Sequence, residues 1–196
     1  IVTSPPESGR GRFRHVVFDH DGTISVLRQG WEPVMAEVMR EAITGDQSYA
    51  TDPDLTRTIS ERIKRFIDET TGVQTIVQMQ GLVSLVREFG LVHEDDVRTA
   101  ATYKRVYNDR LMEYVRDRVE AFESGRYELQ DVTIKGAVDF LRELAGRPGL
   151  TLYLASGTDV ADVREEAETL GYAADFNGGV FGSVGDPRND PKKVVL

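Results

Sequence analysis

Apolar residues follow two different spacings along this chain, and the change of spacing divides it into segments. Val16, Val17 and Phe18 form a short run that is followed by Asp and Gly, which predicts a buried strand over 16–18. From Trp31 to Phe122 the apolar residues recur instead at helical spacing, which predicts several consecutive helices. The glycines that can end these helices are Gly45, Gly72, Gly90 and Gly125.

Strand and helix patterns alternate in the last part of the chain. The apolar stripe from Ile134 to Leu144 predicts a helix, Leu150 to Ala155 predict a second buried strand, and Val160 to Leu170 predict a further helix. A third short strand is expected in "AADFNGGVFG" and the start of a last helix in "DPKKVV". Because this alternation favours a parallel sheet with right-handed crossovers, we predict an α/β fold with a helical subdomain inserted after its first strand.

The predicted boundaries give a core made of residues 13–26 and 131–196 and a helical insert over residues 27–130. Residues 1–12 are rich in Pro, Ser and Gly, so we expect a flexible N-terminus there. The final "PKKVVL" has the pattern of a helix start only, and we therefore expect the natural protein to continue beyond Leu196.

Charge and cysteine content exclude several classes of function. The 196 residues include 24 Lys and Arg against 33 Asp and Glu, and the net charge of −9 argues against nucleic acid or an anionic membrane as a partner. The absence of cysteine excludes disulfides, zinc–thiolate sites and cysteine nucleophiles, and it fits a cytoplasmic location. No apolar run approaches the ~18 residues of a transmembrane helix. We expect a cytoplasmic protein that binds a small molecule. A homodimer is compatible with the sequence, which does not indicate the oligomeric state.

Polar residues directly follow two of the predicted strands. Asp19 and Asp21 come after the first strand, and Ser156, Gly157 and Thr158 come after the second. Ligands of a parallel sheet bind at the carboxyl ends of its strands, so these residues are expected to meet in one site. Two carboxylates at a buried strand end repel each other unless a metal ion, a lysine or a helix N-terminus adds positive potential. Taken alone, the Asp pair is also compatible with a turn, and Ser156 with a helix N-cap.

Three segments together resemble the motifs of the haloacid dehalogenase (HAD) superfamily. "VVFDHDGTIS" is similar to motif I, "LYLASG" to motif II and "DPKKVV" to motif III, and they stand in the family's order. The helical insert between the first two resembles that of members with a C1-type cap. The resemblance, which covers the chain from Phe13 onward, implies an α/β fold: a Rossmann-like parallel-sheet core with an inserted helical cap subdomain.

The resemblance also implies roles for the matching residues. Asp19 would be the nucleophile that forms an aspartyl-phosphate, and Asp21 would be the general acid and base. An Asp at this second position points to phosphoryl transfer, because the family's dehalogenases carry another residue there. Mg²⁺ would be held by the Asp19 carboxylate and the Asp21 backbone carbonyl. Ser156 and Lys192 would also take part in catalysis. The residues that match phosphate-binding positions are Gly22, Thr23, Ser156, Gly157 and Lys192.

Three residues near these motifs need interpretation. Lys193 is an alternative to Lys192, which is favoured because Val195 and Leu196 follow it at i+3 and i+4. His20 is interpreted as a spacer whose backbone shapes the loop. Further acidic metal ligands, motif IV in the family, would come after a next strand that the sequence does not reach. The aspartates of "GDPRND" precede the motif III lysine and are not assigned to the metal.

Substrate-binding residues are expected in the insert. Gln74 and Gln78 stand at i,i+4 on one helix face, and amides that hydrogen-bond hydroxyls would suit a sugar or polyol phosphate. Lys104 is a further candidate. The alternative interpretation places these side chains on solvated helix faces. Arg28 and Trp31, just after motif I, are candidates for the entrance of the site.

We therefore predict a Mg²⁺-dependent phosphatase that hydrolyses a small phosphorylated metabolite through an aspartyl-phosphate intermediate. The alternatives within the family are a phosphomutase and a phosphonate-cleaving enzyme, and the latter would need a Schiff-base lysine such as Lys104. The alternative from another class is a non-catalytic binding protein with the same fold.

Overall fold

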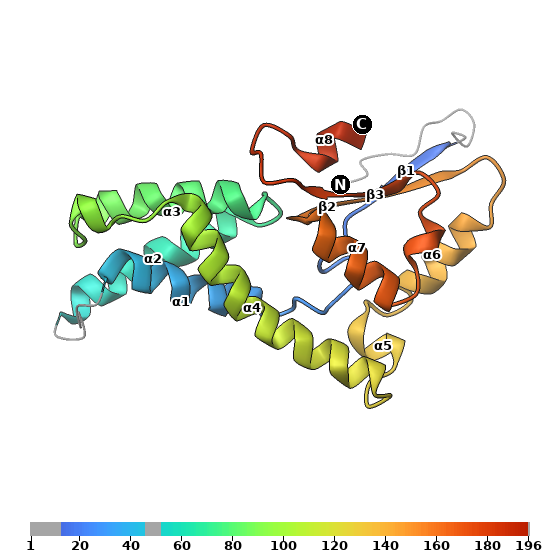
Figure 1. Cartoon of the computed structure of the whole chain (residues 1–196), viewed down its shortest axis with the longest axis horizontal. Helices are drawn as coiled ribbons and strands as arrows, with labels where there is room; N and C mark the ends of the chain where they lie inside the picture. Colours follow the sequence, from blue (N-terminus) through green and yellow to red (C-terminus); the bar gives the residue numbers. More distant parts are fainter. Residues whose placement is uncertain (1–12, 46–51, 196) are drawn as a thin grey trace, which may run out of the picture.

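Three parallel strands form the sheet at the centre of the core (Figure 1). This computed structural model describes residues 13–45 and 52–195, so the flexible N-terminus predicted for residues 1–12 and the position of Leu196 lie outside the described residues. The strands are β1 (His15–Phe18), β2 (Thr151–Asp159) and β3 (Gly179–Ser183), in the order β1-β2-β3. Val16 pairs with Leu152, and Leu154 pairs with Val180. The predicted α/β fold with a parallel sheet is confirmed.

Helices cover both faces of this sheet (Figure 1). α6 (Ala137–Ala145) and α7 (Val160–Thr169) lie on one face, and α8 (Pro191–Val195) lies on the other. Leu152 and Leu154 of the central strand point to one face and Ala155 to the other, and all three are fully buried, as expected for a parallel sheet that is covered on both sides. The other core elements are α5 (Leu129–Val132) and a 3₁₀ turn (Ala173–Asp175).

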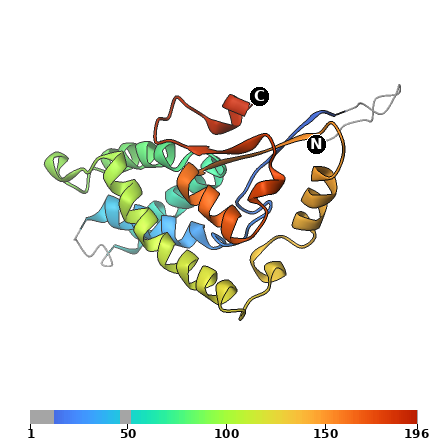
Figure 2. The same ribbon diagram turned by 45° about the vertical axis from the view of Figure 1, so that its right-hand side comes forward.

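A bundle of helices is inserted between β1 and α5 (Figures 1 and 2). Its elements are α1 (Trp31–Thr44), α2 (Pro53–Thr70), α3 (Thr75–Phe89), a 3₁₀ turn (Glu94–Asp96) and α4 (Ala100–Glu123). The helices pack through fully buried apolar side chains such as Met35 and Leu82. α2 and α3 come close at Gly81, where a Cβ would lie 2.5 Å from the Phe66 ring. None of the helices among the described residues has both the length and the apolar character needed to cross a membrane.

The start of α6 differs from the sequence-based expectation. The Ile134 N–H donates to the Ile24 carbonyl at 2.8 Å, and the Ile134 side chain is exposed rather than part of a buried helical stripe. Gly136 then turns the chain with a φ of 77°, a left-handed conformation that glycine adopts readily, and the helix begins at Ala137. The helix predicted from Ile134 is therefore wrong in its first turn, because a backbone contact with a distant segment competes with the local pattern.

Candidate active site

A cavity of about 160 Å³ lies where the carboxyl ends of β1 and β2 meet the helical insert. The lining residues from the core and the segment after β1 are Asp19, Asp21, Arg28, Ser156, Gly157, Thr158 and Lys192. The lining residues from the helical insert are Trp31, Thr71, Gly72, Val73, Thr75, Gln78, Tyr107 and Leu111. The residues at the carboxyl ends of the first two strands therefore meet at one cavity. Ser156, Gly157 and Thr158 belong to β2 itself, so the predicted end of this strand at Ala155 is wrong; the strand continues to Asp159 after a shift in its register with β3.

Asp19, the first residue after β1, is held by two donors. The His20 N–H donates to Oδ1 and the Lys192 Nζ donates to Oδ2, each at 3.0 Å. Lys192 belongs to the first turn of α8, where the Asp190 side chain accepts from the Lys192 N–H at 3.0 Å. The Lys193 side chain is 85% exposed, and its Nζ lies 4.0 Å from Asp190. Of the two lysines, Lys192 is the one that contacts Asp19.

Asp21 lines the same cavity and accepts hydrogen bonds from the end of β2. Ser156 Oγ donates to Asp21 Oδ2 at 3.1 Å, and Thr158 Oγ1 donates to the same atom at 2.8 Å. Burial by itself would raise the pKa of Asp21, but the adjacent His20 and Arg28 outweigh burial and hold this pKa well below its usual range. Asp21 is therefore a carboxylate in this arrangement, the form that can accept a proton.

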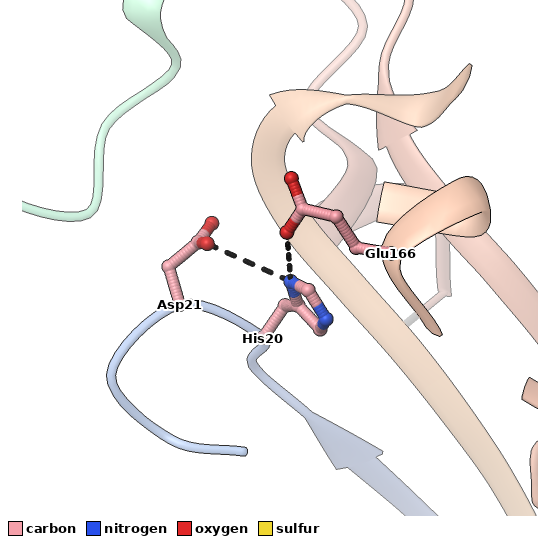
Figure 3. Close-up of side chains that lie close together, drawn as sticks. All are labelled: His20, Asp21 and Glu166. Carbon is pink, nitrogen blue, oxygen red and sulfur yellow. Dashed lines mark ion pairs between the residues drawn. The ribbon is translucent and has the colours of Figure 1, made fainter. Parts of the chain in front are cut away.

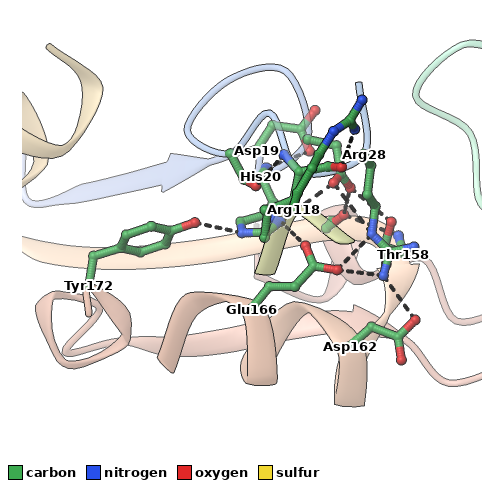
Figure 4. A network of polar contacts seen from close by, with 12 residues as sticks. Asp19, His20, Arg28, Arg118, Thr158, Asp162, Glu166 and Tyr172 are labelled. Carbon is green, nitrogen blue, oxygen red and sulfur yellow. Dashed lines mark hydrogen bonds and ion pairs between the residues drawn. The ribbon is translucent and has the colours of Figure 1, made fainter. Parts of the chain in front are cut away.

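Arg28, Glu166 and Asp162 form a charged network beside the cavity (Figure 4). Arg28 Nε and Nη2 both donate to Oε1 of Glu166, at 2.9 and 2.6 Å, and Nη2 also donates to Asp162 at 3.0 Å. Arg28 Nε lies 3.8 Å from Asp21 Oδ1. Burial raises the pKa of Glu166 although Arg28 opposes this shift. The two acidic residues of α7 thus fix the Arg28 guanidinium beside the cavity.

His20 is fully buried between two of these carboxylates (Figure 3). Its Nδ1 lies 3.6 Å from Asp21 Oδ1 and 3.8 Å from Glu166 Oε2, and all three atoms are buried without a hydrogen-bond partner among the described residues. Its Nε2 hydrogen-bonds with the Tyr172 hydroxyl at 2.8 Å (Figure 4). The side chain of His20 is therefore part of the site's support, beyond the backbone role expected for a spacer.

Gly22 and Thr23 form a tight turn just after Asp21. The Thr23, Ile24 and Ser25 N–H groups all donate to the His20 carbonyl, and Gly22 has a φ of 72°. The Gly22 N–H donates to the Ser25 carbonyl, so these turn hydrogen bonds leave the Asp21 carbonyl available. Gly22 and Thr23 do not line the cavity, and their predicted contact with phosphate gains no support from its geometry.

The substrate candidates of the insert occupy three different environments. Gln78 lines the cavity, and its Nε2 donates to both the carbonyl and the hydroxyl of Thr70 at 3.1 Å. Gln74 does not line the cavity; it is buried and its Oε1 accepts from Ser183 Oγ at 3.0 Å. Lys104 also lies outside the lining, and its Nζ donates to Asp159 Oδ1 at 2.5 Å. Gln74 and Lys104 therefore connect the insert to the core, and only Gln78 is placed to meet a substrate.

Gly157 allows the insert to approach the end of β2 closely. A Cβ at this position would lie 3.3 Å from the Val73 carbonyl oxygen and 3.4 Å from the Gln74 backbone nitrogen. The segment between α2 and α3 thus packs directly on the backbone that follows Ser156. Any side chain at position 157 would displace this contact.

Comparison with known families identifies the chain. The family model of haloacid dehalogenase-like hydrolases matches residues 13–196. The chain belongs to this family. No curated protein and no solved structure gives a significant match. Membership makes the protein a HAD-like hydrolase.

HAD-like hydrolases generally use Mg²⁺, a hard cation that prefers oxygen ligands. The Asp19 carboxylate and the Asp21 carbonyl, which accepts no turn hydrogen bond from the described part of the chain, offer oxygens beside the cavity and fit this preference. A second group, His20 Nδ1, Asp21 Oδ1 and Glu166 Oε2, has all its atoms within 4.8 Å of one another. Its imidazole nitrogen suits a transition metal better than Mg²⁺, and Arg28 already supplies positive charge to both carboxylates. The oxygen pair at Asp19 is therefore the better match for Mg²⁺.

Sequence reasoning missed the acidic partners of Arg28 in this HAD-like hydrolase. Asp162 and Glu166 stand at i,i+4 on α7, next to the buried Val163 and Ala167. Residues four apart share a helix face, so the sequence shows an acidic pair next to the apolar stripe of this helix. That pair was the available signal for a buried cation partner. Their partner, Arg28, stands 138 positions before Glu166 along the chain, and no local sequence pattern indicates a contact over that separation.

Proposed function

We propose that this HAD-like hydrolase is a Mg²⁺-dependent phosphatase that hydrolyses the phosphate monoester of a small metabolite through an aspartyl-phosphate. The observation that carries the proposal is the 3.0 Å contact between Lys192 and Asp19 at a cavity that also contains Asp21 and Ser156. Phosphoryl transfer depends mostly on positioning and on stabilisation of negative charge, and this arrangement offers both.

In the proposed first step, an Asp19 carboxylate oxygen attacks phosphorus while the bond from phosphorus to the leaving oxygen breaks. Asp21 donates a proton to that leaving oxygen. The phosphate dianion favours the protonated form of Asp21, because a like charge nearby raises a carboxyl pKa, and this opposes the effect of Arg28 and His20. In the second step Asp21 accepts a proton from water, which attacks phosphorus and releases inorganic phosphate from Asp19.

The remaining residues would stabilise the transferred group. The Gly157 N–H would donate to a phosphoryl oxygen, Ser156 Oγ would do so once its hydrogen turns away from Asp21, and Lys192 would offset the charge of these oxygens. Mg²⁺ bound by the Asp19 carboxylate and the Asp21 carbonyl would supply further positive charge at the same oxygens. The insert would exclude water from the cavity during the transfer.

The direct test is hydrolysis of p-nitrophenyl phosphate by the full chain, with Mg²⁺ and after its removal by EDTA. We expect phosphate release that requires Mg²⁺ and is abolished in Asp19→Asn, with circular dichroism unchanged. Asp186→Asn, in an exposed ion pair with Arg188, is the matched control and should keep wild-type turnover. Wild-type turnover in Asp19→Asn would contradict the proposal, and a wild-type protein without turnover would favour a non-catalytic binding role.

The same assay separates the other candidate reactions. Release of inorganic phosphate without a sugar bisphosphate activator argues against a phosphomutase. A phosphonate-cleaving reaction would need a free lysine amine at the cavity, whereas Lys104 is paired with Asp159 and does not line it. Phosphate hydrolysis is therefore the reaction that the geometry supports best.

A further inference from the structure

The cavity receives no charged side chain from the helical insert among the described residues. Its lining from the insert consists of aromatic, aliphatic, hydroxyl and amide groups and glycine backbone. The two cations at the cavity, Arg28 and Lys192, are already paired. Arg28 contacts Glu166 and Asp162, and Lys192 contacts Asp19. A second anionic group on a substrate would therefore find no unpaired cation among these lining residues, and its burial would be unfavourable.

Tyr107 is the tyrosine that the insert contributes to the cavity lining. The residue lies on α4, is only 5% exposed and lines the cavity, and its hydroxyl has no hydrogen-bond partner among the described residues. Burial raises the pKa of this hydroxyl well above its usual range, with smaller effects from the nearby Arg28 and Asp21. The group is therefore a neutral donor close to the proposed acid and base. The hydroxyl oxygen is not one of the buried polar atoms that lack a partner, so it is accessible, and a substrate in the cavity can supply its hydrogen-bond partner.

Neighbouring polar groups extend this pattern. Both hydrogen bonds of Gln78 among the described residues use Nε2, which leaves its Oε1 as an acceptor. The Thr71 hydroxyl donates to the Ile67 carbonyl at 2.9 Å and can still accept. Trp31 and Leu111 add apolar surface to the lining. A donor, two acceptors and an apolar wall match a compound that carries several hydroxyls on a carbon skeleton.

The volume also limits the substrate. At about 160 Å³ the cavity is well below the roughly 300–1,000 Å³ of pockets that hold drug-sized ligands. We propose that the substrate is the monophosphate of a small, uncharged polyhydroxyl compound, a sugar or polyol, and that Tyr107 determines specificity by donating to a hydroxyl of the leaving group. This inference rests on the proposed phosphatase function and deepens it.

Matched esters test the charge requirement in the full chain with Mg²⁺. Sorbitol 6-phosphate and 6-phosphogluconate have the same number of carbons, but the second carries a carboxylate. Glycerol 3-phosphate and 3-phosphoglycerate form a smaller pair, and p-nitrophenyl phosphate is an ester without hydroxyls. We expect kcat/KM to be higher for the uncharged member of each pair by at least about tenfold, since an unpaired carboxylate is costly to bury.

Variants of two tyrosines on α4 test the role of Tyr107. Tyr107→Phe should lower kcat/KM for the preferred polyol phosphate by about five- to tenfold more than it lowers kcat/KM for p-nitrophenyl phosphate, the effect of one lost hydrogen bond to a hydroxyl that only the first ester carries. Tyr114→Phe is the matched control, because Tyr114 lies on the same helix and is 55% exposed. This variant should leave kcat/KM unchanged for both substrates.

The outcomes distinguish this inference from the proposed function. Three outcomes would overturn the inference alone. The first is a higher kcat/KM for a carboxylate-bearing ester than for its uncharged partner, and the second is a higher kcat/KM for p-nitrophenyl phosphate than for every polyol ester. The third is an equal loss of kcat/KM on both substrates in Tyr107→Phe. Failure to hydrolyse any ester, p-nitrophenyl phosphate included, would overturn the phosphatase proposal itself.

Discussion

Lys192 Nζ lies 3.0 Å from Oδ2 of Asp19, although 173 positions separate the two residues along the chain. The contact is possible because β1 and β2 are parallel neighbours and α8 packs on β2 and β3 near their carboxyl ends. Lys192 thus provides the positive charge that the Asp19–Asp21 pair requires at the end of a strand.

Lys192→Ala should lower kcat for phosphate ester hydrolysis by roughly 10²–10³-fold, the typical loss when one group that stabilises transition-state charge is removed. Lys193→Ala is the matched control and should stay within about twofold of the wild type, because the Lys193 side chain is exposed and away from Asp19. Steady-state kinetics of the two variants under identical Mg²⁺ concentrations provides the comparison. Equal losses in both variants would contradict the assignment of the motif III lysine.

Glu166→Gln should destabilise the fold by about 3 kcal/mol, because it leaves the buried Arg28 guanidinium without its closest counter-charge. The adjacent Glu165→Gln changes an exposed side chain and should remain within about 0.5 kcal/mol of the wild type. Urea unfolding followed by circular dichroism measures both values. If the two variants unfold at the same urea concentration, the buried network does not contribute to stability.

Gly157→Ala should disturb the contact between the end of β2 and the segment before α3. The added Cβ would stand 3.3 Å from the Val73 carbonyl oxygen, so we expect a loss of about 1–3 kcal/mol in unfolding free energy and a lower kcat/KM. Gly146→Ala is the control, since its Cβ would have ordinary contacts of 3.6 and 3.7 Å and its φ of −74° suits alanine. Thermal unfolding and ester hydrolysis should change in the first variant only.

Lys104 and Asp159 join α4 to the end of β2 in a half-buried ion pair. A double-mutant cycle with Lys104→Met and Asp159→Asn should give a coupling of about 1 kcal/mol in unfolding free energy, near the upper end for partly exposed pairs. Lys104→Met should also keep phosphate ester hydrolysis within about tenfold, because the amine does not line the cavity. Abolished turnover together with an intact fold would instead place Lys104 in the chemistry.

Several features of this protein depend on local sequence alone and were predictable. The run Val16–Phe18 followed by Asp19 and Asp21 specifies a strand with carboxylates at its end, and β1 occurs there. The prediction that this strand is buried is wrong, because β1 pairs with β2 alone among the described residues and Val17 is exposed. Glycines at the ends of the predicted helices match the observed C-terminal ends at Gly45 and Gly90, because glycine adopts positive φ without steric cost. The order of the three motifs along the chain was sufficient to identify the family.

Other features were decided only by tertiary structure. Gln74 and Lys104 had the character of substrate ligands, yet Ser183 and Asp159 are their partners across the boundary between insert and core. Tyr107 belonged to an apolar helical stripe, and its position on that stripe did not indicate that its hydroxyl would meet the cavity.

The physical reason is the range of the interactions. Strand, helix and turn preferences act over a few neighbouring residues, so the sequence by itself determined the element types, the carboxylate pair and the motif order. The partners of Arg28, His20 and Lys192 stand more than 130 positions away, at Glu166, Tyr172 and Asp19. Which charges neutralise one another, and which side chains face the cavity, were decided only when the parallel sheet brought those distant segments together.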